Sequence, residues 1–336
     1  MKKARLMSGF FILIGLIGCS LSNKEISFSG ETMGTTYSIK VIANKKINRE
    51  KFQKDIDSIL IELNNQMSTY IDNSEINQFN RYEGNDPFQL SPQFYQVVKR
   101  ALYWTDLTKG AFDITVMPLT SIWGFGPSGL NSPPSKGQLM DAMRNSGYEH
   151  LTLHLSGLQK TTPKIQIDVN AIAKGYGVDM LASYLNEKQY VNYMVEIGGE
   201  VYCRGLNLKG FHWNIGIQSP SNINHDFLGI VYLYDQAIAT SGDYRNYYIS
   251  DGQEVSHIID PRSGESMTHI ASASVIAKNC MDADALATAL IVMGEKEGMK
   301  LIESLEGIEA LMVVHQEDNS LKNIMSNGFD LKSLKN

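Results

Sequence analysis

Two segments that lie far apart in the sequence contain the residue types that bind metal ions and phosphates. The first is Asp168–Gly177, where an apolar stretch ends on a carboxylate, a turn of small residues carries Lys174, and a helical pattern begins near Tyr176. We expect a strand-to-helix junction here, because backbone groups at such a junction are not used up by regular structure. A carboxylate, an ammonium group and available backbone groups together predict a site for a phosphate or a metal ion.

The second segment, Met281–Met293, is almost entirely apolar apart from two aspartates and one threonine, which predicts a buried helix. Asp284 and Thr288 are four residues apart and therefore lie one above the other on one face. A buried carboxylate must be paired or bound to a cation, and a carboxylate with a hydroxyl suits Mg²⁺. The alternative is that Asp282 and Asp284 only cap the helix N-terminus, and this helix alone does not decide between the two.

Two further segments place polar side chains where strands end. Thr240 and Ser241 offer hydroxyl groups at a Ser-Gly turn, and Arg245 follows with a guanidinium that matches phosphate oxygens. A plain hairpin turn with an exposed arginine is the alternative. His257 and Asp260 could both face a cleft, where the histidine would relay protons, or His257 could be an ordinary strand residue with a satisfied ring.

Glycines next to aromatic residues occur before Asp113, in Trp123–Gly126 and at Met33–Tyr37. Such pairs can form the wall of a site for a flat ring system, although they more often fill a core. The sequence has no GxSxG nucleophile elbow and no Walker P-loop, which argues against a serine hydrolase of that type and a P-loop nucleotidase. A GxGxxG match at 124–129 lies in a glycine- and proline-rich loop and follows no predicted strand, so we do not predict a Rossmann cofactor site.

The elements that must position these groups are strands and helices without strict alternation. Periodicity and capping residues predict helices at 50–67, 91–110, 138–146, 175–188, 281–293 and 295–306. The predicted strands are 35–43, 151–155, 164–169, 190–197, 200–204, 212–217, 228–234, 236–240, 245–249, 255–260, 272–277, 308–315 and 321–325. We predict an α+β fold with a mixed, largely antiparallel sheet core and flanking helices. Residues 31–336 form one domain, and the glycine- and proline-rich loop at 124–137 is the best place for a subdomain division.

The N-terminus has the pattern of a targeting segment. A basic start, MKKAR, precedes an apolar run too short to span a bilayer, and the run ends at the sequence LIGC. This is the bacterial lipoprotein cleavage pattern, so we predict a signal peptide at residues 1–18, a lipidated Cys19 and a tether at 19–30. The alternative is ordinary signal cleavage with an incidental cysteine.

Charge and cysteine content exclude several other classes of protein. The formal net charge of −6 becomes −9 when the three basic residues of the signal are removed, which argues against a nucleic-acid partner. No later segment is apolar enough to cross a membrane. Cys203 and Cys280 have no CxxC spacing, and we expect them to be buried thiols and not a disulfide.

Eight segments, taken in order, resemble the motifs of the ApbE family of FAD:protein FMN transferases, and the resemblance covers nearly all of the chain after the signal. The segments are 33–39, 67–70 with 74–76, 110–116, 168–177, 196–200, 240–244, 257–261 and 284–288. The resemblance implies that FAD binds as substrate with Mg²⁺ and that its pyrophosphate is split. FMN passes to a threonine or serine hydroxyl of a partner protein and AMP leaves. Typical acceptors in the family are membrane subunits of redox-driven ion pumps and other exported flavoproteins.

The resemblance also assigns roles to individual residues. It implies a metal site at Asp284, Thr288 and the carbonyl of Ala171, which shifts the open choice at Asp284 towards a metal ligand. It implies catalytic roles for Asp284 and His257. The implied cofactor-binding residues are Met33, Tyr70, Ala111, Phe112, Asp113, Asp168, Lys174, Thr240, Arg245, His257 and Ile258. Family members vary between lysine and glutamate at the position of Lys174.

The signal and the resemblance together imply an exported protein that is anchored by lipid and faces the periplasm, with the inner membrane preferred. Two other functions are compatible with the same residues. An FAD pyrophosphatase would use water in place of the protein hydroxyl and release free FMN and AMP. A non-catalytic lipoprotein would bind FAD stably in order to store or deliver it.

Overall fold

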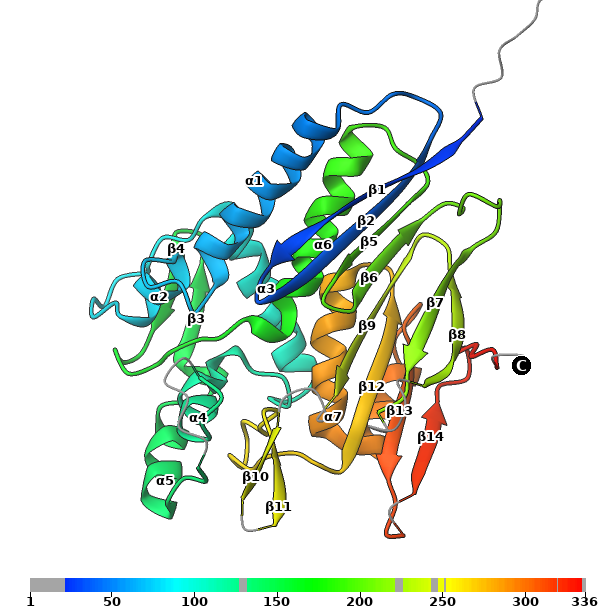
Figure 1. Cartoon of the computed structure of the whole chain (residues 1–336). Helices are drawn as coiled ribbons and strands as arrows, with labels where there is room; N and C mark the ends of the chain where they lie inside the picture. Colours follow the sequence, from blue (N-terminus) through cyan, green and yellow to red (C-terminus); the bar gives the residue numbers. More distant parts are fainter. Residues whose placement is uncertain are drawn as a thin grey trace, which may run out of the picture.

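An eight-stranded antiparallel sheet forms the centre of the computed structural model, which describes residues 22–126, 132–220, 226–242, 247–250, 252–318 and 320–333 (Figure 1). Every pairing between neighbouring strands is antiparallel. In sheet order the strands are β1 (Lys24–Thr32), β2 (Thr35–Ala43), β5 (Tyr193–Ile197), β6 (Glu200–Arg204), β9 (Gln236–Gly242), β12 (Ile270–Ala277), β13 (Glu309–His315) and β14 (Leu321–Met325). The predicted α+β fold with a largely antiparallel sheet is confirmed.

Helices and three small hairpins surround this sheet. The helices are α1 (Arg49–Met67), α2 (Glu75–Asn80), α3 (Pro92–Leu107), α4 (Met117–Ile122), α5 (Lys136–Arg144), α6 (Asn170–Glu187) and α7 (Cys280–Glu303), with short 3₁₀ turns at η1 (Ile114–Val116) and η2 (Tyr148–His150). The hairpins pair β3 (Leu151–His154) with β4 (Gly157–Lys160), β7 (Trp213–Gln218) with β8 (Phe227–Leu233), and β10 (Tyr247–Ser250) with β11 (Gln253–Ser256).

The two faces of the sheet are covered differently. Helices α1, α6 and α7 lie on one face, and the β7–β8 hairpin covers part of the other (Figure 1). Strand alternation separates the side chains: Ala239 and Val275 belong to the helix-side core, whereas Ile238 and Ile276 pack with the hairpin. Because β12 is covered on both faces, all eight of its residues are buried.

Glycines allow the two central helices to take their positions. The predicted division between helices at 281–293 and 295–306 corresponds to a break in α7 at Gly294, where φ is 74° and ψ is 174°. Residues other than glycine rarely adopt this backbone conformation. At Gly175, α6 approaches the start of α7 so closely that an added Cβ would lie 2.7 Å from the carbonyl carbon of Cys280.

The predicted strand at 164–169 is wrong, because side chains take the place of a partner strand. Asn80 donates to the carbonyl of Ile167 (2.9 Å) and accepts from its N–H (2.8 Å). The buried ammonium of Lys160 donates to the carbonyl of Ile165 (3.1 Å), and Asp168 N–H donates to the carbonyl of Ile114 (2.7 Å). The helix then begins at Asn170 and not near 175, so Ala171 and Lys174 lie in its first turns.

The N-terminal segment also differs from the prediction. Residues 24–30 are not part of a tether, because they belong to β1, which pairs along its whole length with β2. Phe28 fixes the strand by stacking on Phe52 of α1, with ring centroids 4.3 Å apart. Cys19, the predicted signal peptide and residues 127–131 of the predicted division loop lie outside the described residues.

Two further expectations concern cysteines and membrane spans. Cys203 in β6 and Cys280 at the start of α7 are buried free thiols, as predicted. None of the helices in the described ranges has the length and apolar character that a membrane crossing requires.

The contact between α6 and α7 predicts different effects for two helical glycines. We expect Gly175→Ala to lower the free energy of unfolding by about 1–3 kcal/mol or more, because the new methyl group would collide with the backbone of Cys280 and with Asp284. Gly137→Ala in α5 is the matched control, since no atom lies within 4 Å of its added Cβ, and the higher helix propensity of alanine should stabilise by up to about 1 kcal/mol. Urea unfolding of both variants measures the difference, and equal stabilities would contradict the close approach.

Candidate functional site

One cavity of about 550 Å³ collects the residues that the sequence analysis singled out. Its volume is in the range of small-molecule sites. The described residues to which the resemblance assigns a role all line it: Met33, Tyr70, Ala111, Phe112, Asp113, Asp168, Ala171, Lys174, Thr240, His257, Ile258, Asp284 and Thr288. Asp260, which could have faced the cleft with His257, does not line it, and its carboxylate is ion-paired with Arg262 (2.8 Å). Arg245 and Cys19 lie outside the described residues. Segments separated by more than 250 positions therefore meet at one place.

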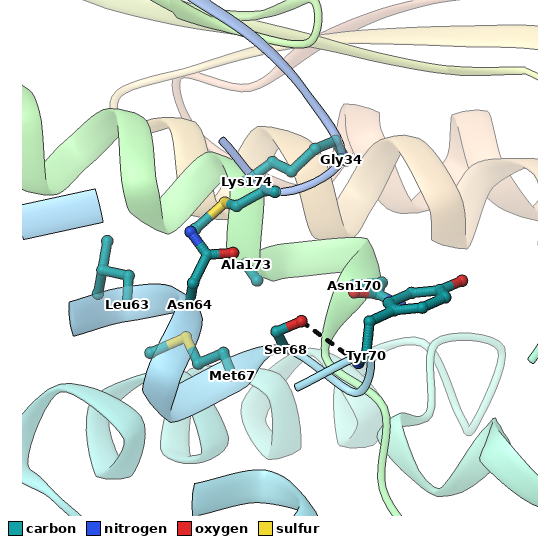
Figure 2. Close-up of a pocket in the computed structure, with 10 residues that line it drawn as sticks. Gly34, Leu63, Asn64, Met67, Ser68, Tyr70, Asn170, Ala173 and Lys174 are labelled. Atoms are coloured by element: carbon teal, nitrogen blue, oxygen red, sulfur yellow. Dashed lines mark hydrogen bonds between the residues drawn. The ribbon is translucent and has the colours of Figure 1, made fainter. Parts of the chain in front are cut away.

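A second cavity of about 420 Å³ adjoins the first and shares five lining residues with it: Met33, Gly34, Tyr70, Asn170 and Lys174. Figure 2 shows its lining, in which the Tyr70 N–H donates to Ser68 Oγ (3.3 Å). Tyr70 is 68% exposed, so its ring offers an open aromatic face at the junction of the two cavities. Together the cavities have room for an extended ligand with a flat ring.

The ends of neighbouring strands bring the wall of the cavity together. The β1–β2 turn presents Met33 and Gly34, both in the left-handed region with φ of 49° and 72°. The β5–β6 turn at Gly198 leads into Glu200, and β9 ends at Thr240–Gly242. Because β1, β2, β5, β6 and β9 are consecutive neighbours in an antiparallel sheet, these three positions lie at the same end of the sheet.

Asp284 is the acidic centre of the cavity, and it is only 2% exposed. Its Oδ2 accepts a hydrogen bond from the Gly175 N–H (2.9 Å). In a regular helix that N–H would be the partner of the Ala171 carbonyl. Thr288, one turn further along α7, contacts Ser241 through a hydrogen bond between the two hydroxyls (3.0 Å). The helical spacing predicted for Asp284 and Thr288 therefore places both side chains at the cavity.

Lys174 lies between two buried carboxylates. Its Nζ is 3.4 Å from Glu200 Oε1 and 3.7 Å from Asp284 Oδ1. The two carboxylate side chains are 3% and 2% exposed, and that of the lysine is 28% exposed. Glu200 is not among the predicted site residues, although it ends the segment 196–200 that resembles a family motif. Only the strand pairing shows that the β5–β6 turn brings Glu200 to Lys174.

The oxygen groups in the cavity fit Mg²⁺. Across the described ranges, no three His, Cys, Asp or Glu side chains cluster in a way that would hold a metal ion. A metal ion here would instead use one carboxylate, one hydroxyl and one backbone carbonyl, from Asp284, Thr288 and Ala171. All are hard oxygen donors, and Mg²⁺ completes such a set with water and substrate phosphate.

The two aspartates of α7 have different surroundings. Asp282 accepts from Arg100 Nε (2.5 Å) and Nη2 (2.7 Å), from Trp104 Nε1 (2.8 Å) and from Asn279 Nδ2 (2.7 Å). Asn279 is the N-cap of α7, and its side chain accepts from the Asp282 N–H. Asp282 is therefore an acidic residue of the first turn that joins α3 to the start of α7, and the cap itself is Asn279. Asp284 faces the cavity.

Two further carboxylates organise loops at the cavity. Asp113 accepts from the N–H and hydroxyl of Thr115 (both 2.8 Å) and from the Tyr148 N–H (2.9 Å). Asp168 accepts from the Asn170 N–H (2.7 Å) at the start of α6. Burial raises the pKa of both carboxyls above the ordinary value for aspartate, and these hydrogen bonds oppose the rise. The Asp113 bonds fix the loop that presents Ala111 and Phe112 to the cavity.

His257 lines the cavity just after β11. The predicted strand at 255–260 ends at Ser256, so the interpretation of His257 as an ordinary strand residue is wrong. Its ring lies edge-on to Phe125, with centroids 6.2 Å apart. Ile258 beside it is buried, and both residues line the same cavity as Asp284. The imidazole therefore lies on the wall of the cavity.

The cavity lies at the end of an antiparallel sheet and combines oxygen donors, an ammonium group and aromatic rings. These features are those of the class of proteins whose site suits a phosphorylated ligand with a flat ring. The model of the ApbE family matches residues 33–312, and the chain belongs to that family. The chain is 44% identical to the FAD:protein FMN transferase of Vibrio cholerae (94% of this chain, 95% of the relative) and 36% identical to that of Haemophilus influenzae (98% of each).

Solved structures agree with the sequence comparison. The flavin transferase ApbE from Vibrio cholerae superposes with a TM-score of 0.84 at 42% identity and covers 91% of this chain and 98% of its own. The flavinyl transferase ApbE of Pseudomonas stutzeri, in its apo form, gives 0.83 at 34% identity (91% and 95%). The predictions of the family and of its enzyme class are confirmed.

The start of α7 predicts a pH effect on stability. The Asp179 side chain accepts from the Cys280 N–H (2.8 Å) and the Met281 N–H (2.9 Å). Burial, reinforced by the nearby charges of Asp282 and Asp284, raises its pKa from 3.8 to about 7. Between pH 3.8 and about pH 7, the Asp179 carboxyl of the folded protein therefore holds a proton that it has lost in the unfolded chain. The stability that this carboxyl contributes is therefore fully present below about pH 4 and falls as the pH rises to about 7.

Asp179→Asn removes this titration. In chelator-treated protein, we expect the stability of the wild type relative to the variant to fall by roughly 2–4 kcal/mol between pH 4 and pH 7. Urea unfolding across this range measures the difference. A difference that stays constant with pH would show that the carboxyl is ionised in the folded protein throughout.

Proposed function

We propose that this protein transfers FMN from FAD to a threonine or serine hydroxyl of an acceptor flavoprotein, with Mg²⁺, and releases AMP. The observation that carries the proposal is the meeting of Asp284, Thr288, Lys174 and His257 in one cavity with Tyr70 and the Met33 turn. Family membership supports the same reaction, since relatives that match along nearly their whole length are FAD:protein FMN transferases. The cavity offers both a polar centre for a pyrophosphate and an apolar wall for a ring.

Asp284, Thr288 and the Ala171 carbonyl would hold the metal ion. Mg²⁺ bound there would draw negative charge from the pyrophosphate oxygens. Lys174 has its ammonium within 4 Å of the Asp284 carboxylate, so it can also reach a phosphate bound beside that group. Phosphoryl-type transfer depends mainly on such positioning and charge neutralisation.

The acceptor hydroxyl oxygen forms a bond to the phosphorus on the FMN side of FAD. The bond from that phosphorus to the bridging oxygen breaks, and the oxygen leaves with AMP. The hydroxyl proton passes to a base in the cavity, for which His257 is our assignment because its ring lines the same space. The products are a flavin phosphoester on the acceptor and AMP, so no oxidant or reductant is required.

The predicted lipoprotein signal gives the proposed place of the reaction. With Cys19 lipidated, the enzyme would stay on the periplasmic side of the inner membrane. Acceptors at that location include exported flavoproteins and the membrane subunits of redox-driven ion pumps, in line with the family resemblance.

Asp284→Ala tests the metal site. We expect Mg²⁺-dependent transfer to fall at least about a hundredfold, because the variant loses the one carboxylate of the ligand set. The assay incubates the protein with FAD, Mg²⁺ and a candidate acceptor and measures covalent flavin by in-gel fluorescence. Glu297→Gln, an exposed carboxylate beyond the break in α7, is the matched control and should keep full activity.

The same assay separates the other two functions. Free FMN and AMP without a fluorescent acceptor would indicate a pyrophosphatase. FAD that co-purifies and is never turned over would indicate a storage or delivery protein. Full transfer activity in Asp284→Ala would contradict the proposed metal site.

Lys174→Met tests how the buried carboxylates are neutralised. Without metal, we expect a loss of about 1–3 kcal/mol in unfolding free energy, because Glu200 and Asp284 lose the nearby ammonium. Mg²⁺ should then raise the melting temperature of the variant more than that of the wild type, because the ion no longer meets a neighbouring positive charge. Lys99→Met, at an exposed position of α3, is the control. Unchanged stability of Lys174→Met, or an equal response to Mg²⁺, would contradict this role.

A further inference from the structure

The end of the sheet opposite the cavity has a distinct surface. Strand registers pair Lys24 with Ala43, Val41 with Tyr193, and Tyr193 with Arg204. The start of β1 therefore lies beside the end of β2, the start of β5 and the end of β6, at the upper right of the sheet in Figure 1. We call this surface the basic end, and it comprises residues 22–26, 43–49, 187–192, 204–212 and 234–235.

Basic side chains gather at this end of an otherwise acidic protein. A groove of about 530 Å³ is lined by Lys24, Lys45, Lys46 and Arg49, and no acidic side chain is among its described lining residues. Lys188 and Lys209 are exposed on the adjoining loops. The acidic residues of the basic end are Glu25, Glu187 and Asp235, so positive charge predominates there although the whole chain has a net charge of −6.

Exposed apolar side chains accompany these charges. Phe211 is 68% exposed, Val191 59%, Leu208 48% and Tyr234 47%. Val191 lies in the connection from α6 to β5, Leu208 and Phe211 lie between β6 and β7, and Tyr234 lies between β8 and β9. All four therefore belong to the basic end. Single exposed apolar residues are normal on a protein surface. Several of them beside a lysine cluster are typical of surfaces that bind at the membrane–water interface.

The path of the chain connects this surface to the predicted anchor. Ser22 lines the groove with the basic residues. Cys19 is three residues earlier, and three residues of extended chain reach about 10 Å. A lipid on Cys19 would therefore hold the basic end, and not the cavity, against the membrane.

We propose that the basic end binds anionic phospholipid headgroups and fixes the orientation of the enzyme on the membrane. Each lysine or arginine near an anionic surface contributes about 1 kcal/mol, and acyl anchoring combined with a basic patch gives stable attachment. The inference rests on the proposed membrane location but not on the flavin chemistry. It places the cavity at the far end of β1 and β2, roughly 30 Å from the lipid surface for strands of nine residues.

The test uses the processed protein, isolated from membranes in detergent and reconstituted on phosphatidylcholine vesicles with or without phosphatidylglycerol. The rate of chemical modification of each lysine is measured by mass spectrometry. We expect Lys24 and Lys188 to react several-fold more slowly on the anionic vesicles, and high salt to remove the difference. Lys136 on α5 is the internal reference, and its rate should be the same on both vesicles.

Paired charge reversals give the matched comparison. Lys45→Glu with Lys46→Glu should abolish the protection of Lys24 and Lys188, whereas Lys136→Glu with Lys322→Glu changes the net charge equally and should leave it intact. Equal rates on the two kinds of vesicle, equal effects of the two double variants, or no binding to either vesicle would overturn the proposal. Binding to anionic vesicles alone would support it even without a lipid on Cys19.

Flavin transfer to an acceptor in detergent is measured on the same variants, so that failure of the surface and failure of the proposed function are distinguished. The charge reversals should leave that activity unchanged. If the lysine protection is lost but transfer is normal, only the proposal on the basic end is contradicted. If the wild type shows the lysine protection but no transfer, only the proposed function is contradicted.

Discussion

The contact between α6 and α7 at Gly175 is the constraint on which the site depends. Because this position has no side chain, the first turns of α6 lie against the start of α7, and the Gly175 N–H donates to Asp284. The same contact brings the Ala171 carbonyl and Lys174 to the face of α7 that carries Thr288. Asp282 holds that end of α7 to Arg100 and Trp104 of α3, and Asp179 caps it from α6. The position of the oxygen donors is therefore set by helix packing and not by a flexible loop.

This packing concentrates negative charge in a poorly solvated place. Asp284 and Glu200 are almost fully buried, and Lys174 is the cation that the structure places within 4 Å of both. Buried carboxylates require such compensation, and a divalent ion compensates more strongly than one ammonium group. A site of this kind favours a ligand that binds together with a metal ion. The Lys174 ammonium could then pair with a phosphate of the ligand while Asp284 coordinates the metal. Under the proposed function, binding of the nucleotide and of the metal would be coupled through Lys174.

The sequence predicts the parts of this site that depend on local geometry. Helical spacing alone relates Asp284 to Thr288, and Gly294 ends that half of α7 as its conformation requires. Tertiary effects account for the failures. The segment 164–169 has a strand pattern, but Asn80 and Lys160 supply its hydrogen bonds from the side. Strand β1 alternates in burial, but its only large apolar residues are Ile26 and Phe28, so its sequence pattern is weak. Glu200 reaches Lys174 only through strand pairing, which a single sequence does not specify.

The antiparallel sheet also fixes how the two ends of the molecule are related. Strand β1 begins at the basic end and finishes at the cavity after nine residues. Its length cannot change without a shift in its register with β2, and that register buries Phe28, Tyr37 and Ile39. A protein held by its basic end would keep its cavity at one height above the lipid. On the proposed orientation the transferase would have little freedom to lower the site, so an acceptor would have to present its hydroxyl group on a segment that extends well beyond the membrane surface. Selection among acceptors would follow from this reach as well as from the residues around the hydroxyl.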